Sequence, residues 1–140
     1  MSSTGIVLLI VAVIFMCGVG LHAYKQYNIR LLQRMKQNEY DAAVTIWEYA
    51  RLVKTEIDEA IRQGTGIIDF TRITVPHSKG YRVSLELIGS YFRVYAIPGR
   101  HAKTGRLSFV TDNTLIVRAA DRDGEQATCG DPEYKGEPIE

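Results

Sequence analysis

An uncharged run near the start of the chain, residues 6–21, constrains the fold more than any other feature. It leads into residues 24–63, which contain neither proline nor glycine and are rich in good helix formers. We therefore predict a continuous helix of roughly forty residues after the run, with Gly64 and Gly66 as its stop signal. An apolar segment joined directly to an amphipathic helix is typical of a membrane anchor followed by a stem.

The apolar run reaches the length of a membrane span when its uncharged flanks are included. A span needs about 20 residues, and residues 2–5 and 23–24 extend the run, so we predict a transmembrane segment over residues 1–24. A cleaved secretory signal is the main alternative, but residues 1–5 contain no Lys or Arg. The residues expected to contact lipid or a partner helix are Ile6, Leu9, Ile10, Val13, Met16, Cys17, Gly18 and Gly20.

The composition leaves room for one modest domain beside the anchor, because the chain has 140 residues. Seventeen basic and sixteen acidic residues nearly balance, which argues against a nucleic-acid partner. One cysteine, Cys17, lies in the apolar run and the other, Cys129, lies near the carboxyl terminus. We read them as independent thiols, since a disulfide would have to bridge the membrane and the head.

Residues 25–63 form the predicted amphipathic stem, and its apolar stripe is uneven. The stripe is thin between Ile29 and Asp41 and dense from Ala42 to Ile61. We therefore expect the first part to be an exposed neck and the second part to pack on a domain. A coiled coil is the alternative, but about two convincing heptads are too few to establish one. The helix residues predicted to pack are Ile46, Trp47, Val53 and Ile57.

Beyond Gly66 the apolar period becomes alternating, which is typical of strands. Strands are predicted at residues 81–88, 91–97, 106–112 and 115–120, with Gly89-Ser90 as a two-residue hairpin turn. The fold class is therefore α+β: an antiparallel sheet of about four strands in a head of residues 64–120, covered by the stem helix. The strand residues expected to pack on the helix are Leu85, Phe92, Val94 and Phe109. Residues 121–140 are expected to form an irregular tail that is either laid on the surface or disordered.

This layout resembles that of type IV pilins and type II secretion pseudopilins. The resemblance is carried by the helix with an apolar first half, and by residues 91–98, Thr104-Gly105-Arg106-Leu107-Ser108-Phe109, Asp112 and 116–121. It implies a structural or assembly role in a pilus or secretion-type system. It also implies an inner-membrane anchor with the head outside the cytoplasm. The basic residues that follow the apolar run, Lys25, Arg30, Arg34 and Lys36, favour the opposite orientation.

The chain departs from the pilin pattern at the peptidase site, where the family carries a Gly, an aromatic residue and a Glu five positions into the mature chain. Here Gly5 is followed by Ile6, and the Glu position is Ile10. The resemblance implies that this Glu joins neighbouring subunits. Its absence favours a second function, an accessory subunit that docks by its helix and head onto a larger bacterial membrane complex.

Motifs for chemistry are sparse in the sequence. His22, His77 and His101 are isolated, and no sequence motif for covalent haem, nucleotide phosphate or a serine nucleophile occurs. We therefore expect no enzyme activity, no cofactor, no nucleic acid and no small-molecule substrate. The expected partners are membrane lipid and other membrane or pilin-like subunits. Asp121 and Asp123 have the spacing of part of a calcium loop, but a solvated turn is the favoured interpretation.

Overall fold

The computed structural model describes residues 3–65, 68, 71 and 73–136, with side chains from residue 13 onward. The chain divides into two compact units, residues 1–33 and residues 34–140. The described secondary structure is one helix, α1 (Ser3–Arg62), and four strands, β1 (Tyr81–Ile88), β2 (Tyr91–Pro98), β3 (Leu107–Asp112) and β4 (Arg118–Asp121). The predicted α+β class, with one long helix and a four-stranded antiparallel sheet, is confirmed.

Helix α1 ends close to where the sequence predicts. Gly64 adopts a positive φ of 67°, which glycine reaches without steric cost. Two backbone bonds then close the last turn: the Gly64 amide donates to the Ile61 carbonyl at 3.0 Å, and the Thr65 amide donates to the Ala60 carbonyl at 3.2 Å. These bonds satisfy carbonyl groups that a helix end otherwise leaves without a partner.

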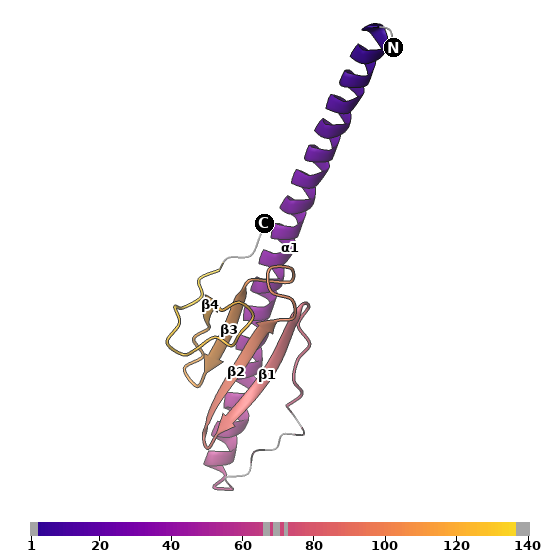
Figure 1. The fold of residues 1–140 in the computed structure, drawn as a ribbon. Helices are drawn as coiled ribbons and strands as arrows, with labels where there is room; N and C mark the ends of the chain where they lie inside the picture. Colours follow the sequence, from indigo (N-terminus) through magenta and orange to yellow (C-terminus); the bar gives the residue numbers. More distant parts are fainter. Residues whose placement is uncertain (1–2, 66–67, 69–70, 72, 137–140) are drawn as a thin grey trace. The chain divides into compact units, whose positions relative to one another are not determined.

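The sheet is an antiparallel meander in the order β1-β2-β3-β4 (Figure 1). Ile88 pairs with Tyr91, so Gly89 and Ser90 form the predicted two-residue turn, with Gly89 at a φ of 63°. The last strand begins later than predicted, at Arg118, because Leu115 adopts a φ of 59° that an extended strand excludes. The Leu115 amide instead donates to the Asp112 carbonyl at 2.9 Å and closes a turn.

The core of the larger unit lies between the sheet and the carboxyl-terminal half of α1, which runs along one face of the strands in Figure 1. The helix contributes residues three or four apart, so a single stripe faces the sheet. Alternate residues of β2 and β3 face the stripe. The buried cluster contains Ala42, Ala43, Ile46, Tyr49, Ala50, Val53 and Ile57 from the helix and Tyr81, Phe92, Val94, Ala96 and Phe109 from the strands.

Helix contacts with the head begin earlier than predicted, inside the segment expected to be an exposed neck. Met35 is buried. The Asn38 side-chain amide donates to the Thr104 carbonyl at 2.9 Å. The Glu39 carboxylate accepts the backbone amides of Arg106, at 2.7 Å, and Leu107, at 3.3 Å. Asn38 and Glu39 make their contacts through polar groups, so the spacing of apolar residues along the helix does not predict these contacts.

The described part of the tail, residues 122–136, is irregular but packed against the head. The Ala119 amide donates to the Pro132 carbonyl at 3.0 Å, and the Tyr134 amide donates to the Val117 carbonyl at 2.8 Å, so the tail runs beside β4. The Tyr134 ring meets Phe109 edge to face at 5.0 Å. Because Phe109 belongs to the buried core, the tail is a structural part of the head.

Candidate membrane and partner interface

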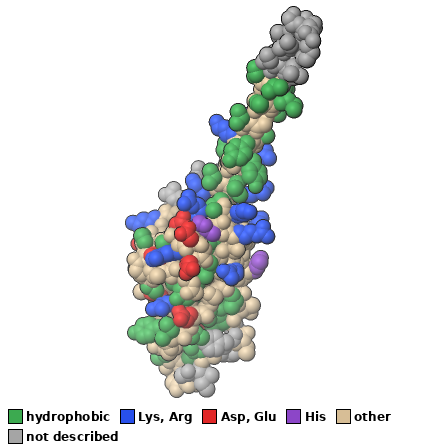
Figure 2. All heavy atoms as spheres, viewed as in Figure 1, with side chains coloured by type: hydrophobic (Ala, Val, Ile, Leu, Met, Phe, Trp, Pro, Cys, Tyr) green, Lys and Arg blue, Asp and Glu red, His purple; other side chains and the backbone are tan. Residues whose placement is uncertain are grey.

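Residues 13–16 of the smaller unit present an apolar surface on all sides of α1. Val13 and Met16 are 54% and 75% exposed, and the two residues between them are exposed as well. Four consecutive helical residues span about 300° around the axis, so the apolar surface surrounds the helix; one side of it is visible in Figure 2. A helix that is apolar on every side normally lies inside a protein or a membrane. The exposed large apolar residues of this unit are Val13, Ile14, Phe15, Met16, Val19, Leu21, Tyr24, Tyr27, Ile29 and Leu32.

The predicted interface residues are only partly described. Val13, Met16 and Cys17 are exposed, and a Cβ added at Gly18 or Gly20 would meet no atom within 4 Å. The side chains of Ile6, Leu9 and Ile10 lie outside the described residues. Close approach of another helix at Gly18 and Gly20 stays a prediction.

Within the part of the chain that the structure describes, no helix combines the length and the apolar character that crossing a membrane requires.

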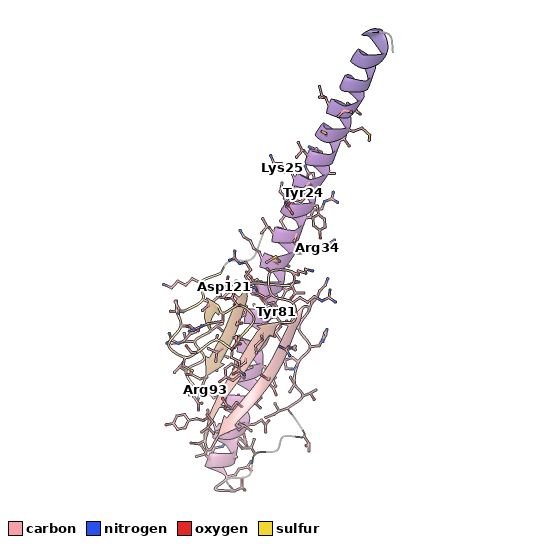
Figure 3. The ribbon with its side chains drawn as sticks, viewed as in Figure 1. Tyr24, Lys25, Arg34, Tyr81, Arg93 and Asp121 are labelled. Atoms are coloured by element: carbon pink, nitrogen blue, oxygen red, sulfur yellow. The ribbon has the colours of Figure 1, made fainter. Side chains whose placement is uncertain are left out.

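A change from apolar to basic character follows the exposed apolar surface. Tyr24 and Lys25 occupy consecutive positions of α1 (Figure 3), and Tyr27 and Arg30 follow. All four side chains are exposed. Tyrosine carries an apolar ring with a polar tip, which suits the boundary between hydrocarbon and water. We call Lys25, Arg30, Arg34 and Lys36 the basic segment.

The residues predicted to join helix and sheet mostly lie in the core. Ile46, Val53, Ile57, Phe92, Val94 and Phe109 are buried there, and Leu85 packs against them. The prediction for Trp47 is wrong, since its side chain is 39% exposed and lies outside the buried cluster. Trp47 follows Ile46 by about 100° around the helix, which carries it off the stripe. Its ring instead lies beneath the Arg51 guanidinium, with 5.3 Å from Cζ to the ring centroid.

Trp47 also lines a shallow apolar groove of about 180 Å³ between the helix and the tail. Tyr40, Val44, Val117 and Tyr134 contribute further to its walls. Sequence reasoning missed this groove because it depends on the fold of the tail, which has no regular apolar period. Its polar lining is minor and includes no carboxylate, histidine or cysteine side chain among the described residues.

A cluster of polar residues lies where the loop after β2 approaches the end of β4. His101 Nε2 is 2.8 Å from Asp121 Oδ1, and the Arg106 guanidinium donates to Asp121 Oδ2 at 2.9 Å. The pKa of Asp121 lies below its usual value because the carboxylate forms hydrogen bonds with His101, with the Asp123 amide and with Arg106, in decreasing order of effect. The prediction that His101 is isolated is therefore wrong. His22 and His77 are exposed.

His101, Asp121 and Asp123 are close enough to act as metal ligands, with one ligand atom from each lying within 4.8 Å of the others. However, both oxygens of Asp121 already take part in hydrogen bonds, and one of the donors is the cationic Arg106. A cation at this place would have to displace that guanidinium. Calcium binding at Asp121 and Asp123 therefore stays an untested alternative to the solvated turn.

The free thiol of Cys129 lies on the other face of the sheet. It packs against a small buried cluster formed by Tyr95, Val110 and Ala127. A polar hollow of about 340 Å³ beside it is lined by Arg93 and Tyr95 together with residues 125–129. The Tyr95 hydroxyl donates to Glu86 at 2.9 Å. Burial, followed by this hydrogen bond, raises the pKa of Tyr95, so the hydroxyl stays protonated at neutral pH.

No protein-family model matches this chain, and no curated protein or solved structure matches it either. The resemblance to pilins and pseudopilins therefore stays a prediction from the sequence.

Proposed function

We propose that this chain is a non-enzymatic, single-span membrane protein with a pilin-like head, and that it has a structural or assembly role in a pilus or secretion-type system. The observation that carries the proposal is the double character of α1 (Ser3–Arg62). Its described amino-terminal part exposes apolar side chains on every side, whereas residues 42–57 form one wall of the head core. One helix therefore offers an anchor surface and a packing surface.

Exposure of the apolar surface supports an anchoring role. Burial of apolar area contributes roughly 25 cal/mol per Å², and contiguous exposed apolar patches on soluble proteins usually mark an interaction site. The uncharged sequence continues upstream of Val13 through Ile6. Lipid or the apolar helices of other subunits would remove this surface from water. We place the anchor in the inner membrane and the head outside the cytoplasm.

The alternative function is that of an accessory subunit of a larger bacterial membrane complex. The uncharged run lacks any carboxylate, and Ile10 occupies the position where pilins carry Glu. A charged group in hydrocarbon is costly unless it is paired, so this chain can stay in the bilayer without a neighbour that supplies a charge. That property favours a docked subunit over a subunit that enters a filament.

The membrane proposal is tested with thiol labelling in intact cells. Ser90 lies exposed in the hairpin turn, so Ser90→Cys is introduced into a chain that also carries Cys17→Ser and Cys129→Ser. A membrane-impermeant maleimide should label the introduced cysteine in spheroplasts without permeabilisation. A chain that keeps only Cys17 should resist the reagent until detergent is added. Release of the whole chain by alkaline carbonate would contradict the span, and labelling of the Ser90→Cys variant only after lysis would reverse the orientation.

The two functions are separated by purification of the native chain in mild detergent, followed by intact-mass measurement. A mass that corresponds to cleavage after Gly5 with N-methylation supports the filament system. An intact amino terminus together with a stoichiometric set of other membrane subunits supports the accessory role. A monodisperse chain with no other subunit would count against both.

A further inference from the structure

Charge is segregated along this chain. Residues 1–38 contain four basic residues and no acidic residue, because the first carboxylate is Glu39. Of the 17 basic residues, the remaining 13 share residues 39–140 with all 16 acidic residues, which gives that part a net charge of −3. The near-neutral total therefore conceals a cationic segment next to the apolar run and a mildly anionic head.

The basic segment differs in its partners from several basic residues of the head. Among the residues that the structure describes, none of Lys25, Arg30, Arg34 and Lys36 forms an ion pair. Their side chains are exposed. Five basic residues of the head, by contrast, have a carboxylate within ion-pair distance, namely Lys54, Arg62, Arg93, Arg106 and Arg122. The charges of the basic segment are thus available to an external anion.

The spacing of the first two cations suits a layer of anions better than a single bound group. Lys25 and Arg30 are about 140° apart around a helix and about 7.5 Å apart along its axis. They point to different sides of α1. In the sequence, the exposed Tyr24 precedes Lys25, and the exposed Tyr27 lies between Lys25 and Arg30. The polar headgroup region on each side of a bilayer is roughly 5–8 Å deep. A helix that emerges through this layer meets headgroups on all sides.

We propose that Lys25 and Arg30 bind the headgroups of anionic phospholipids at the membrane surface, on different sides of the emerging helix, and that Arg34 and Lys36 add electrostatic attraction from beyond the headgroup layer. This inference rests on the proposed membrane span and adds a lipid class to it. Each Lys or Arg near an anionic surface contributes about 1 kcal/mol.

The test uses the full chain reconstituted into vesicles of phosphatidylcholine with phosphatidylglycerol. Electron paramagnetic resonance of spin-labelled lipids measures the motionally restricted fraction in contact with protein, once for labelled phosphatidylglycerol and once for labelled phosphatidylcholine. We expect the anionic lipid to be preferred by about two- to fivefold at low salt, since 1 kcal/mol corresponds to about fivefold. The preference should fall towards one in 1 M NaCl, where the Debye length is about 3 Å.

Two matched variants identify the source of the preference. One carries Lys25→Gln, Arg30→Gln, Arg34→Gln and Lys36→Gln, and the other carries Lys79→Gln, Arg82→Gln, Lys103→Gln and Lys135→Gln, which are exposed residues of the head. Both remove four charges. The first should abolish the preference and the second should keep it. Equal restriction of the two lipids by the unaltered chain, or a preference that survives the first variant, overturns the inference. Absence of any restricted lipid overturns the membrane span itself.

Discussion

Replacement of Tyr134 by Ala tests whether the tail belongs to the folded head. The Tyr134 ring is partly buried and meets Phe109 edge to face at 5.0 Å. An aromatic pair contributes about 0.5–1.5 kcal/mol beyond burial. Loss of about 100 Å² of buried ring surface adds roughly 2.5 kcal/mol at most. We therefore expect Tyr134→Ala to lower the free energy of unfolding of the head by about 3 kcal/mol.

The assay is urea unfolding of the full chain in mild detergent, followed by the fluorescence of Trp47, the single tryptophan. With a urea dependence of about 1.5 kcal/mol per M for a domain of this size, the midpoint should fall by about 2 M. Tyr134→Phe keeps the ring pair and should stay near the unaltered midpoint. Tyr91→Ala is the matched control, because Tyr91 is exposed at the hairpin turn. If Tyr134→Ala and Tyr91→Ala unfold at the same urea concentration, the tail contributes nothing and the reasoning is refuted.

Three further experiments test the core, a close backbone contact and the acid stability of the head. Ile46→Ala should cost about 2–5 kcal/mol because Ile46 is fully buried, whereas exposed Trp47→Ala should cost about 1 kcal/mol or less; calorimetry that ranks them equally would reject the assigned helix face. Gly105→Ala should lower the melting temperature, since its Cβ would lie against the Tyr81 hydroxyl, whereas Gly130→Ala should not. Hydrogen bonds from Arg122 hold the pKa of Asp131 below its ordinary 3.8, so the carboxylate stabilises the head above that pH and loses its effect as the pH falls through the lower folded value. Urea midpoints of Asp131→Asn should therefore fall less between about pH 5 and about pH 2 than those of the unaltered chain.

The helix, the hairpin and most of the core could be predicted because they produce periodic signals. The repeat of three and four places Ile46, Val53 and Ile57 on one face, and strand alternation places Phe92 and Val94 on another. The exposure of Trp47 was available from the same period, since one residue beyond Ile46 leaves the stripe. A large apolar ring is usually buried, which favoured the wrong prediction for this residue.

The contacts that the sequence did not predict are hydrogen bonds made by backbone groups and polar side chains. The Glu39 carboxylate accepts two amides at the start of β3, 67 and 68 residues away, and His101 contacts Asp121, 20 residues away. Nothing in the local sequence identifies such partners before the loops are folded. The tail is similar, because its bonds to Val117 and Ala119 involve main-chain atoms that every residue possesses. The positive φ of Leu115, which makes the last strand begin later than predicted, likewise has no signal in the local sequence.

The Glu39 carboxylate has a consequence for how the chain tolerates changes in length. Its bonds to the Arg106 and Leu107 amides fix the axial position and rotation of the helix against the sheet. One residue inserted between Glu39 and Ala42 would rotate the core stripe by about 100° relative to Glu39, so that Glu39 and the stripe could not both face the sheet. An insertion before residue 34 leaves that alignment intact. The helix before residue 34 can therefore change in length without disturbing the core, whereas the segment between Glu39 and Ala42 cannot.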